Sequence, residues 1–246
     1  MKKFLAILML LCMVVSLVAC NNGEAEQTTE ANGTEAPAFD AAAKSEGVMT
    51  YAEYEAAALQ AAVVVEGYVQ ATQSWWDNKI TAYLQDPDGA YFCYEMACTE
   101  EDAAKLTKGT KIKVTGFKAE WSGEIEIADC SFEFVESEKW VAEATDVTDL
   151  LGKDELIKHQ NKFVTFKGLT VVSVEYKNGE PGDEIYVTVS KDGAEYSFCV
   201  ERYLTDPETE VYKAFATLQA GDIVDIDGFL YWYEGVNTHI TAVTKK

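Results

Sequence analysis

A glycine pattern that occurs twice is the feature that most constrains the fold of this chain. Within each copy, three glycines follow one another at intervals of seven residues. They are Gly109, Gly116 and Gly123 in the first copy and Gly221, Gly228 and Gly235 in the second, an offset of 112 residues throughout. The tripeptide Asp-Gly-Ala also recurs, at residues 88–90 and 192–194. Similarity at a fixed spacing is typical of a repeated structural unit, so the sequence predicts two copies of a unit of about 100 residues.

Each copy contains five segments with the alternation or composition of a β-strand. In the first copy they are residues 63–72, 80–85, 90–96, 110–118 and 124–135, and in the second 162–176, 184–190, 194–201, 223–231 and 236–244. A short helix is expected between the third and fourth segments, after Thr99 in the first copy and within 207–218 in the second. Two more short helices are expected at 51–60 and 154–159.

The alternation also predicts which side chains face the interior. Ile80, Ala82 and Leu84 share one face of the second segment, and Phe92, Tyr94 and Met96 share one face of the third. The opposite, outward face is then predicted to carry Thr81, Tyr83, Gln85, Tyr91, Cys93 and Glu95.

Five strands with a helix between the third and fourth is the order of an OB fold. Over residues 50–246 the chain resembles the OB-fold modules of bacterial exported proteins. The resemblance implies a mainly β protein with two five-stranded OB-like β-barrels in tandem, domain 1 at 49–140 and domain 2 at 141–246. Another small β-barrel or a β-sandwich is the alternative that the pattern leaves open.

The amino terminus has the pattern of an export signal. Two lysines precede an apolar run over 4–19, and the run ends in Leu17-Val18-Ala19-Cys20. This end resembles the bacterial lipobox, which implies cleavage before Cys20 and diacylglycerol, with further acyl chains such as palmitate, on the new terminus. An ordinary secretory signal or an anchor helix is the alternative.

We therefore expect a signal peptide at 1–19, and at 20–48 the lipidated Cys20 followed by a flexible, acidic tether. The expected location is outside the cytoplasm, anchored by lipid to the bacterial cell membrane and displayed at the cell surface.

The net charge of the chain disfavours nucleic acid as a partner. The formal charge is −22, and Arg202 is the only arginine. Nucleic-acid binding depends on basic side chains that neutralise phosphates, so this composition disfavours it without excluding a local basic patch. The plain interpretation is that acidity keeps an exported protein soluble.

Aromatic residues in the expected loops are the candidate binding residues. OB folds bind ligands on strands 2 and 3 and in the loops between strands 1 and 2 and strands 4 and 5. The candidates are Trp75, Trp76, Tyr83, Tyr91 and Trp121 in domain 1 and Tyr231, Trp232 and Tyr233 in domain 2. The three tryptophans of domain 1 are expected at one mouth of the barrel. The alternative is that these side chains pack with one edge in water. Domain 2 is expected to be a weaker site or to dock against domain 1.

No catalytic residue, metal site or cofactor is predicted. The sequence lacks the spacing of zinc ligands, a P-loop and a serine-hydrolase elbow. His159 and His239 are far apart, and structural roles are favoured for both. Four cysteines remain after the signal and Cys20, namely Cys93, Cys98, Cys130 and Cys199, and free thiols are slightly favoured over disulfides.

The sequence therefore favours a non-enzymatic surface lipoprotein that binds a glycan, a peptide or an envelope protein. One alternative is a binder of single-stranded nucleic acid outside the cytoplasm, as OB folds often are. Another is an accessory subunit of an envelope enzyme or transport complex.

Overall fold

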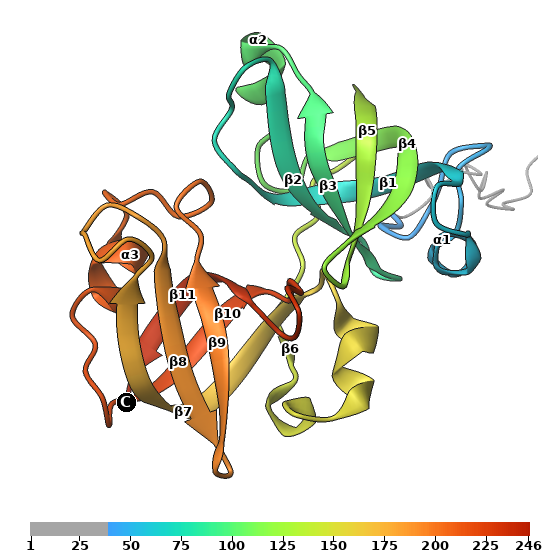
Figure 1. Cartoon of the computed structure of the whole chain (residues 1–246). Coiled ribbons are helices and arrows are strands. Elements are labelled where there is room, and N and C mark those ends of the chain that lie inside the picture. Colours follow the sequence, from blue (N-terminus) through green and yellow to red (C-terminus); the bar gives the residue numbers. More distant parts are fainter. Residues whose placement is uncertain (1–38) are drawn as a thin grey trace, which may run out of the picture. The chain divides into compact units, whose positions relative to one another are not determined.

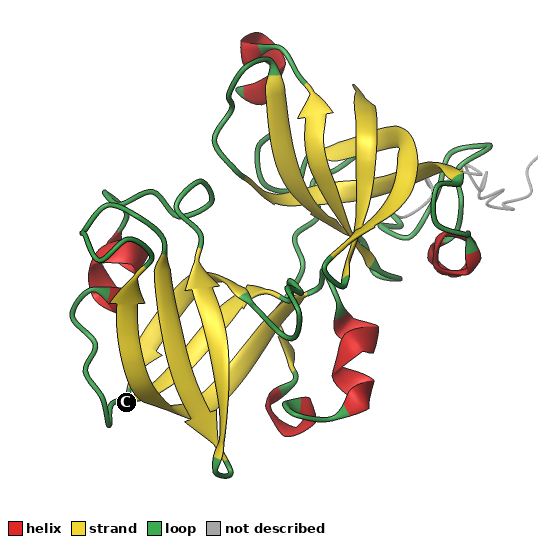
Figure 2. Cartoon of the chain, in the orientation of Figure 1, coloured by secondary structure: helices red, strands yellow, loops and turns green. Residues whose placement is uncertain are grey.

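The computed structural model describes residues 39–246, and β-strands dominate it (Figures 1 and 2). The predicted signal peptide, Cys20 and most of the predicted tether lie outside the described residues. Within the described part of the chain, no helix is both long enough and apolar enough to cross a membrane.

Barrel 1 is a closed sheet of five strands. They are β1 (Ala62–Thr72), β2 (Lys79–Gln85), β3 (Ala90–Ala97), β4 (Lys111–Trp121) and β5 (Glu124–Phe134), hydrogen-bonded in the order β1-β2-β3-β5-β4 with β4 returning to β1. The helix α2 (Glu100–Ala103) lies between β3 and β4, and the Thr99 side chain accepts a hydrogen bond from the Asp102 amide as its N-cap.

Barrel 2 repeats this strand order. Its strands are β7 (Phe163–Tyr176), β8 (Ile185–Lys191), β9 (Ala194–Val200), β10 (Ile223–Phe229) and β11 (His239–Lys245). The order is β7-β8-β9-β11-β10, the pairing of β10 with β7 closes the barrel, and the short β6 (Thr145–Asp146) adds in parallel to β7. The helix α3 (Glu210–Phe215) lies between β9 and β10. The prediction of a mainly β fold with two five-stranded OB-like barrels is confirmed.

Three further short helices flank the barrels. α1 (Tyr51–Ala56) precedes barrel 1, and the 3₁₀ helices η1 (Thr148–Leu150) and η2 (Asp154–His159) precede β7. α1 begins with a capping box, in which Thr50 Oγ1 accepts from the Glu53 amide and the Glu53 carboxylate accepts from the Thr50 amide. These two reciprocal bonds at its N-terminal end fix where this short helix begins.

A bulge in β3 makes the predicted facing of that strand wrong. Tyr91 and Cys93 point into the barrel 1 core together with Met96, whereas Tyr94 is 43% exposed. The register against β2 shifts between Ile80 and Ala82, and Glu95 takes a positive φ of 46° at the shift. An extra residue at a bulge reverses the inward and outward alternation beyond it. A single alternation counted back from Met96 therefore gives the wrong facing for residues 91–94, and Phe92, expected to face inward, packs with Tyr83 on the outer side.

The middle glycine of each repeat is required for a steric reason. A Cβ on Gly116 in β4 would lie 2.5 Å from Cys130 Cβ, and a Cβ on Gly228 in β10 would lie 2.4 Å from the His239 carbonyl oxygen. Both distances are shorter than real contacts allow, so only glycine lets the neighbouring strand approach this closely.

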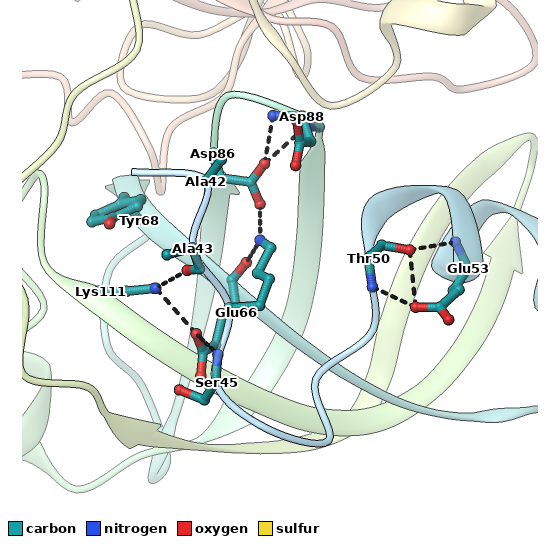
Figure 3. A network of polar contacts seen from close by, with 12 residues as sticks. Ala42, Ala43, Ser45, Thr50, Glu53, Glu66, Tyr68, Asp86, Asp88 and Lys111 are labelled. Atoms are coloured by element: carbon teal, nitrogen blue, oxygen red, sulfur yellow. Dashed lines mark hydrogen bonds and ion pairs between the residues drawn. The ribbon is translucent and has the colours of Figure 1, made fainter. Parts of the chain in front are cut away.

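The end of the predicted tether contacts barrel 1. Within residues 39–48, Lys44 pairs with the buried Asp86, and the Ser45 amide donates to the Glu66 carboxylate at 3.2 Å (Figure 3). Lys111 donates to the Ala43 carbonyl at 2.6 Å and lies 3.1 Å from Glu66. Residues 39–48 thus supply partners to the buried carboxylates of Asp86 and Glu66. The sequence predicted that this stretch is part of a flexible tether.

Candidate functional site

The loop between β1 and β2 is a tight hairpin that presents Trp76. Asp77 and Asn78 both have positive φ, 48° and 60°. Two backbone hydrogen bonds join Trp76 and Lys79 across them, 3.1 Å and 2.9 Å long. Positive φ at both central residues is the geometry of a type I′ turn, which suits the twist of a hairpin. The Trp76 side chain is 73% exposed at the base of this turn.

Trp75 is held in place by the barrel. Its Nε1 donates to the Cys98 carbonyl at 2.8 Å, and its half-buried ring packs against the barrel 1 core. The indole therefore stays fixed beside the more exposed Trp76.

The two tryptophans border a hollow of about 670 Å³, which we call the aromatic recess. Its walls come from the β1–β2 loop, from β2 and β3, and from the stretch after β9. The lining residues are Gln73, Ser74, Trp75, Trp76, Lys79, Ile80, Thr81, Tyr94, Glu95, Arg202, Tyr203, Asp206 and Pro207. The Tyr203 carbonyl accepts from the Ser74 amide at 2.7 Å, which ties the two sides of the recess together.

Charges inside the aromatic recess are balanced. Lys79 lies 2.7 Å from Glu95, and their hydrogen bond lowers the pKa of Glu95 and raises the pKa of Lys79. Arg202 and Asp206 add one charge of each sign. The recess therefore offers aromatic faces and polar groups without a strong local charge.

Trp121 lies in a second hollow of about 980 Å³, which we call the acidic cleft. Tyr231 and Tyr233, from the loop between β10 and β11, line the same cleft. Tyr94 and Gln73 line both hollows. The three tryptophans expected at one mouth are thus divided, with Trp75 and Trp76 in the recess and Trp121 in the cleft.

Tyr83 faces away from the barrel 1 core, as the alternation of residues along β2 predicts, but it is only 1% exposed. Its ring stacks on Phe229 of barrel 2 at 4.4 Å between centroids, and its Oη lies 2.6 Å from His239 Nδ1. Burial raises the pKa of Tyr83 and lowers the pKa of His239 to about 3. The sequence treated this face as open to ligand, whereas residues of barrel 2 cover it.

Tyr91 cannot contact a ligand on the outer face either. It is fully buried in the barrel 1 core, where its ring meets Tyr54 edge-on at 5.0 Å. The bulge in β3 is the reason, because it places Tyr91 on the inner side. Tyr94 takes the outward place and is the aromatic residue that the sequence argument missed on this strand.

Trp232 packs against barrel 1. A Cβ on Gly123 would lie 2.8 Å from Trp232 Cδ1, and the Trp232 amide donates to Glu124 Oε2 at 2.8 Å. Nearby, the Glu234 amide donates to the Ser122 carbonyl at 2.8 Å. The loop between β10 and β11 therefore docks on the loop between β4 and β5, in line with the docking role considered for domain 2.

Glu124 is a buried carboxyl that no sequence signal marked. It is fully buried and also accepts from Gln160 Nε2 at 3.1 Å. Burial raises its pKa to about 8, although the bond from Trp232 acts in the opposite direction. It supports the docking of the two loops and does not line either hollow.

The thiols and the acidic groups define no reactive centre within residues 39–246. Cys93, Cys98, Cys130 and Cys199 are free and buried, in line with the favoured prediction. Burial raises the pKa of Cys130 to about 12, and an un-ionised thiol is a poor nucleophile. In the same residues, no three His, Cys, Asp or Glu side chains are placed to hold a metal ion.

The fold and the two hollows define a protein of tandem OB-like barrels with an aromatic surface. No family model matches the chain, and no curated protein matches it. Solved structures do resemble it. A murine DNA-binding protein bound to double-stranded DNA is 12% identical, with 74% of this chain and 96% of that chain covered and a TM-score of 0.37. The HINa domain of Ifi202 in complex with 20-bp double-stranded DNA is 13% identical, with coverage of 76% and 98% and a TM-score of 0.33.

A replication protein A heterotrimer bound to single-stranded DNA is 11% identical, with coverage of 78% of this chain and 50% of that chain and a TM-score of 0.30. At this level of identity the likeness concerns the fold and not the residues of a site.

Proposed function

We propose that this chain is a non-enzymatic binding protein that holds a saccharide in the aromatic recess. The observation that carries the proposal is the placement of Trp76. An indole that is 73% exposed is held on a rigid turn beside the anchored Trp75, at the strand 2–3 side of a closed barrel. OB folds bind oligosaccharides and oligonucleotides at this side.

The chemistry of the recess suits a neutral ring. Aromatic faces supply apolar contact area, and a few polar groups then fix orientation. Gln73, Ser74 and Thr81 offer amide and hydroxyl groups around the rings, and the charged pair of Lys79 and Glu95 can bond hydroxyls without favouring either sign of ligand. A saccharide meets both requirements.

The second candidate is a single-stranded oligonucleotide. Lys79 and Arg202 line the recess beside rings on which bases could stack, and such stacking contributes about 1–3 kcal/mol per base. Glu95 and Asp206 line the same recess, and the formal charge of the chain is −22, so phosphates meet repulsion there. This is why the saccharide is preferred.

The proposal also places the protein outside the cytoplasm, anchored to the bacterial membrane through lipid on Cys20. The motif at 17–20 supports this, and the recess would then meet envelope ligands, including a peptide or a partner protein of a larger complex. Labelling of cells with a palmitate analogue should mark the wild-type chain and not Cys20→Ala. Equal labelling of both would refute the anchor.

The recess is tested by binding to the full-length chain in detergent. A glycan array identifies the saccharide, and calorimetry compares wild type with Trp76→Ala. We expect affinity to fall by about 10-fold or more, since the burial of a large aromatic surface is lost. The matched control is Phe117→Ala, because Phe117 is 48% exposed on β4 and lies outside the recess.

A titration with single-stranded DNA at low and high salt separates the two candidates. DNA binding that weakens steeply with salt and depends on Trp76, without glycan binding, would replace the saccharide by the oligonucleotide. Unchanged affinity of Trp76→Ala for every bound ligand would refute the recess as the site.

A further inference from the structure

The acidic cleft is bordered by elements of both barrels. Glu126 of β5 and Trp121 at the end of β4 lie on one side. Glu201, which directly follows β9, and Tyr231 of the β10–β11 loop lie on the other. Its volume of about 980 Å³ is in the range of small-molecule sites, which span roughly 300–1,000 Å³. The cleft is large enough for a small organic ligand.

Carboxylates dominate the charged groups of the cleft. Glu126, Glu184, Glu201 and Glu234 line it, whereas Lys177 is its only lining cation among the described residues. Lys177 already pairs with Glu184 at 2.9 Å. Crowded and partly desolvated carboxylates disfavour one another's ionisation, and the pKa of Glu201 is raised to about 7, chiefly by burial.

Most of the buried carboxylates have partners, but Glu126 has none within residues 39–246. The Glu201 carboxylate accepts from the amides of Tyr203 and Leu204, each at 2.9 Å. The Glu126 residue as a whole is 9% exposed, its carboxylate oxygens are not among the fully buried ones, and within residues 39–246 no side chain or amide gives them a hydrogen bond or an ion pair. The side chain of Glu126 is mostly covered, and its carboxylate opens into the cleft without a protein partner, so a cationic ligand in the cleft can pair with it directly.

Aromatic rings line the same cleft as Glu126, and they indicate which class of cation the cleft suits. Trp121 and Tyr233 are 61% and 49% exposed, and the ring of Tyr231 stacks on His239 at 4.0 Å. Rings of this kind attract organic cations through their faces and also contact methylene groups. A metal ion would need several oxygen, nitrogen or sulfur ligands together, and within 39–246 no group of three or more His, Cys, Asp or Glu side chains is so placed.

We propose that the acidic cleft binds an alkyl amine of the polyamine class, with an ammonium group paired to Glu126 and the methylene chain against Trp121 and Tyr231. A second ammonium group of such a ligand meets the remaining carboxylates of the cleft. This site adjoins the aromatic recess through Gln73 and Tyr94, but Glu126, Trp121 and Tyr231 line the cleft alone, so the proposal does not depend on a saccharide in the recess.

Calorimetry with putrescine on the full-length chain in detergent tests the site. We expect binding by wild type, and a loss of affinity of about 10-fold or more in Glu126→Gln, because a hydrogen bond to a charged partner is replaced by a neutral one. Trp121→Ala should also weaken binding, and its ring is exposed enough that folding does not depend on it. The control is Glu136→Gln, an exposed carboxylate outside the cleft, which should bind as wild type does.

Two further titrations decide between ligand classes. Butanediol, which has the same chain length as putrescine but no charge, should not bind, and calcium chloride should not compete with putrescine. The proposal is overturned if putrescine does not bind, if Glu126→Gln binds it as tightly as wild type, or if the diol binds equally well. None of these outcomes bears on the recess, whose tests use Trp76.

Discussion

Glu124 shows how much a single side chain can be changed by its surroundings. It is one of 42 acidic residues, and nothing in the sequence around it distinguishes it from the others. Its place at the start of β5, beneath Trp232, removes it from water and raises its pKa to about 8. Residue-scale properties of this kind depend on contacts with residues far away in the chain, here 108 positions on. Sequence reasoning could not find them.

The stability of the chain should depend on pH through Glu124. The folded state keeps its proton up to a pKa of about 8, while the unfolded chain releases it near 4.5. Between these values the unfolded state binds fewer protons, so this group makes stability fall as pH rises. Glu124→Gln keeps an oxygen acceptor for the Trp232 amide and removes the titration. Its melting temperature relative to wild type should therefore rise between pH 5 and pH 8.

Thermal unfolding at several pH values measures this effect, with Glu136→Gln as the exposed control. A difference between Glu124→Gln and wild type that stays constant over the whole range would contradict the shifted pKa.

At the scale of elements, periodicity and turn residues predicted most of the fold. The strand β3 was expected at 90–96 and spans Ala90–Ala97, and η2 has the expected bounds, Asp154–His159. The facing of β3 was not predictable, because a non-glycine bulge such as that at Glu95 leaves no mark in a pattern of alternating residues. The candidate Tyr91 was lost, and Tyr94 was missed, for that one reason.

The requirement for glycine at Gly228, where β10 and β11 approach closely, can be tested by substitution. Gly228→Ala would place a Cβ 2.4 Å from the His239 carbonyl oxygen, which is backbone and cannot swing aside. We expect the free energy of unfolding to fall by about 1–3 kcal/mol, the usual cost of overpacking. Gly179→Ala is the control, since a Cβ there meets nothing within 4 Å and only its positive φ of 76° opposes the change.

Denaturant unfolding of both variants gives the comparison. If Gly228→Ala costs no more than Gly179→Ala, the close approach of β10 and β11 is not what requires glycine at this position.

At the scale of the whole molecule, contacts between barrels decide which surfaces remain for ligands. Tyr83, Phe92 and Phe229 form a small buried cluster of their own, built from both barrels. From the sequence, Tyr83 is an outward aromatic residue on the second strand and therefore a candidate binding residue. Only the structure shows that Phe229 of barrel 2 covers it. The recess at Trp76 and the cleft at Trp121 stay open, and they are the two surfaces proposed for ligands.

The bond between Tyr83 and His239 should contribute measurably to the stability of this arrangement. Gln73 Nε2 donates to Tyr83 Oη at 3.2 Å, and the same Oη shares a hydrogen bond 2.6 Å long with His239 Nδ1. Because burial lowers the pKa of His239 to about 3, this buried ring is neutral at pH 7, and its Nδ1 has the Tyr83 hydroxyl as its partner in either tautomer. Tyr83→Phe keeps the ring stacked on Phe229 and removes that partner. The free energy of unfolding should fall by about 1–3 kcal/mol, the cost of a buried group left unpaired.

The matched control for Tyr83→Phe is Tyr203→Phe, because Tyr203 is 53% exposed and its hydroxyl is not needed by a buried partner. Denaturant midpoints at pH 7 should drop for Tyr83→Phe and stay unchanged for Tyr203→Phe. Equal midpoints for both variants and wild type would mean that the hydroxyl adds nothing to the contact between the barrels. The stacked rings of Tyr83 and Phe229 would then have to hold that contact, and the loss of stability should appear in Phe229→Ala instead.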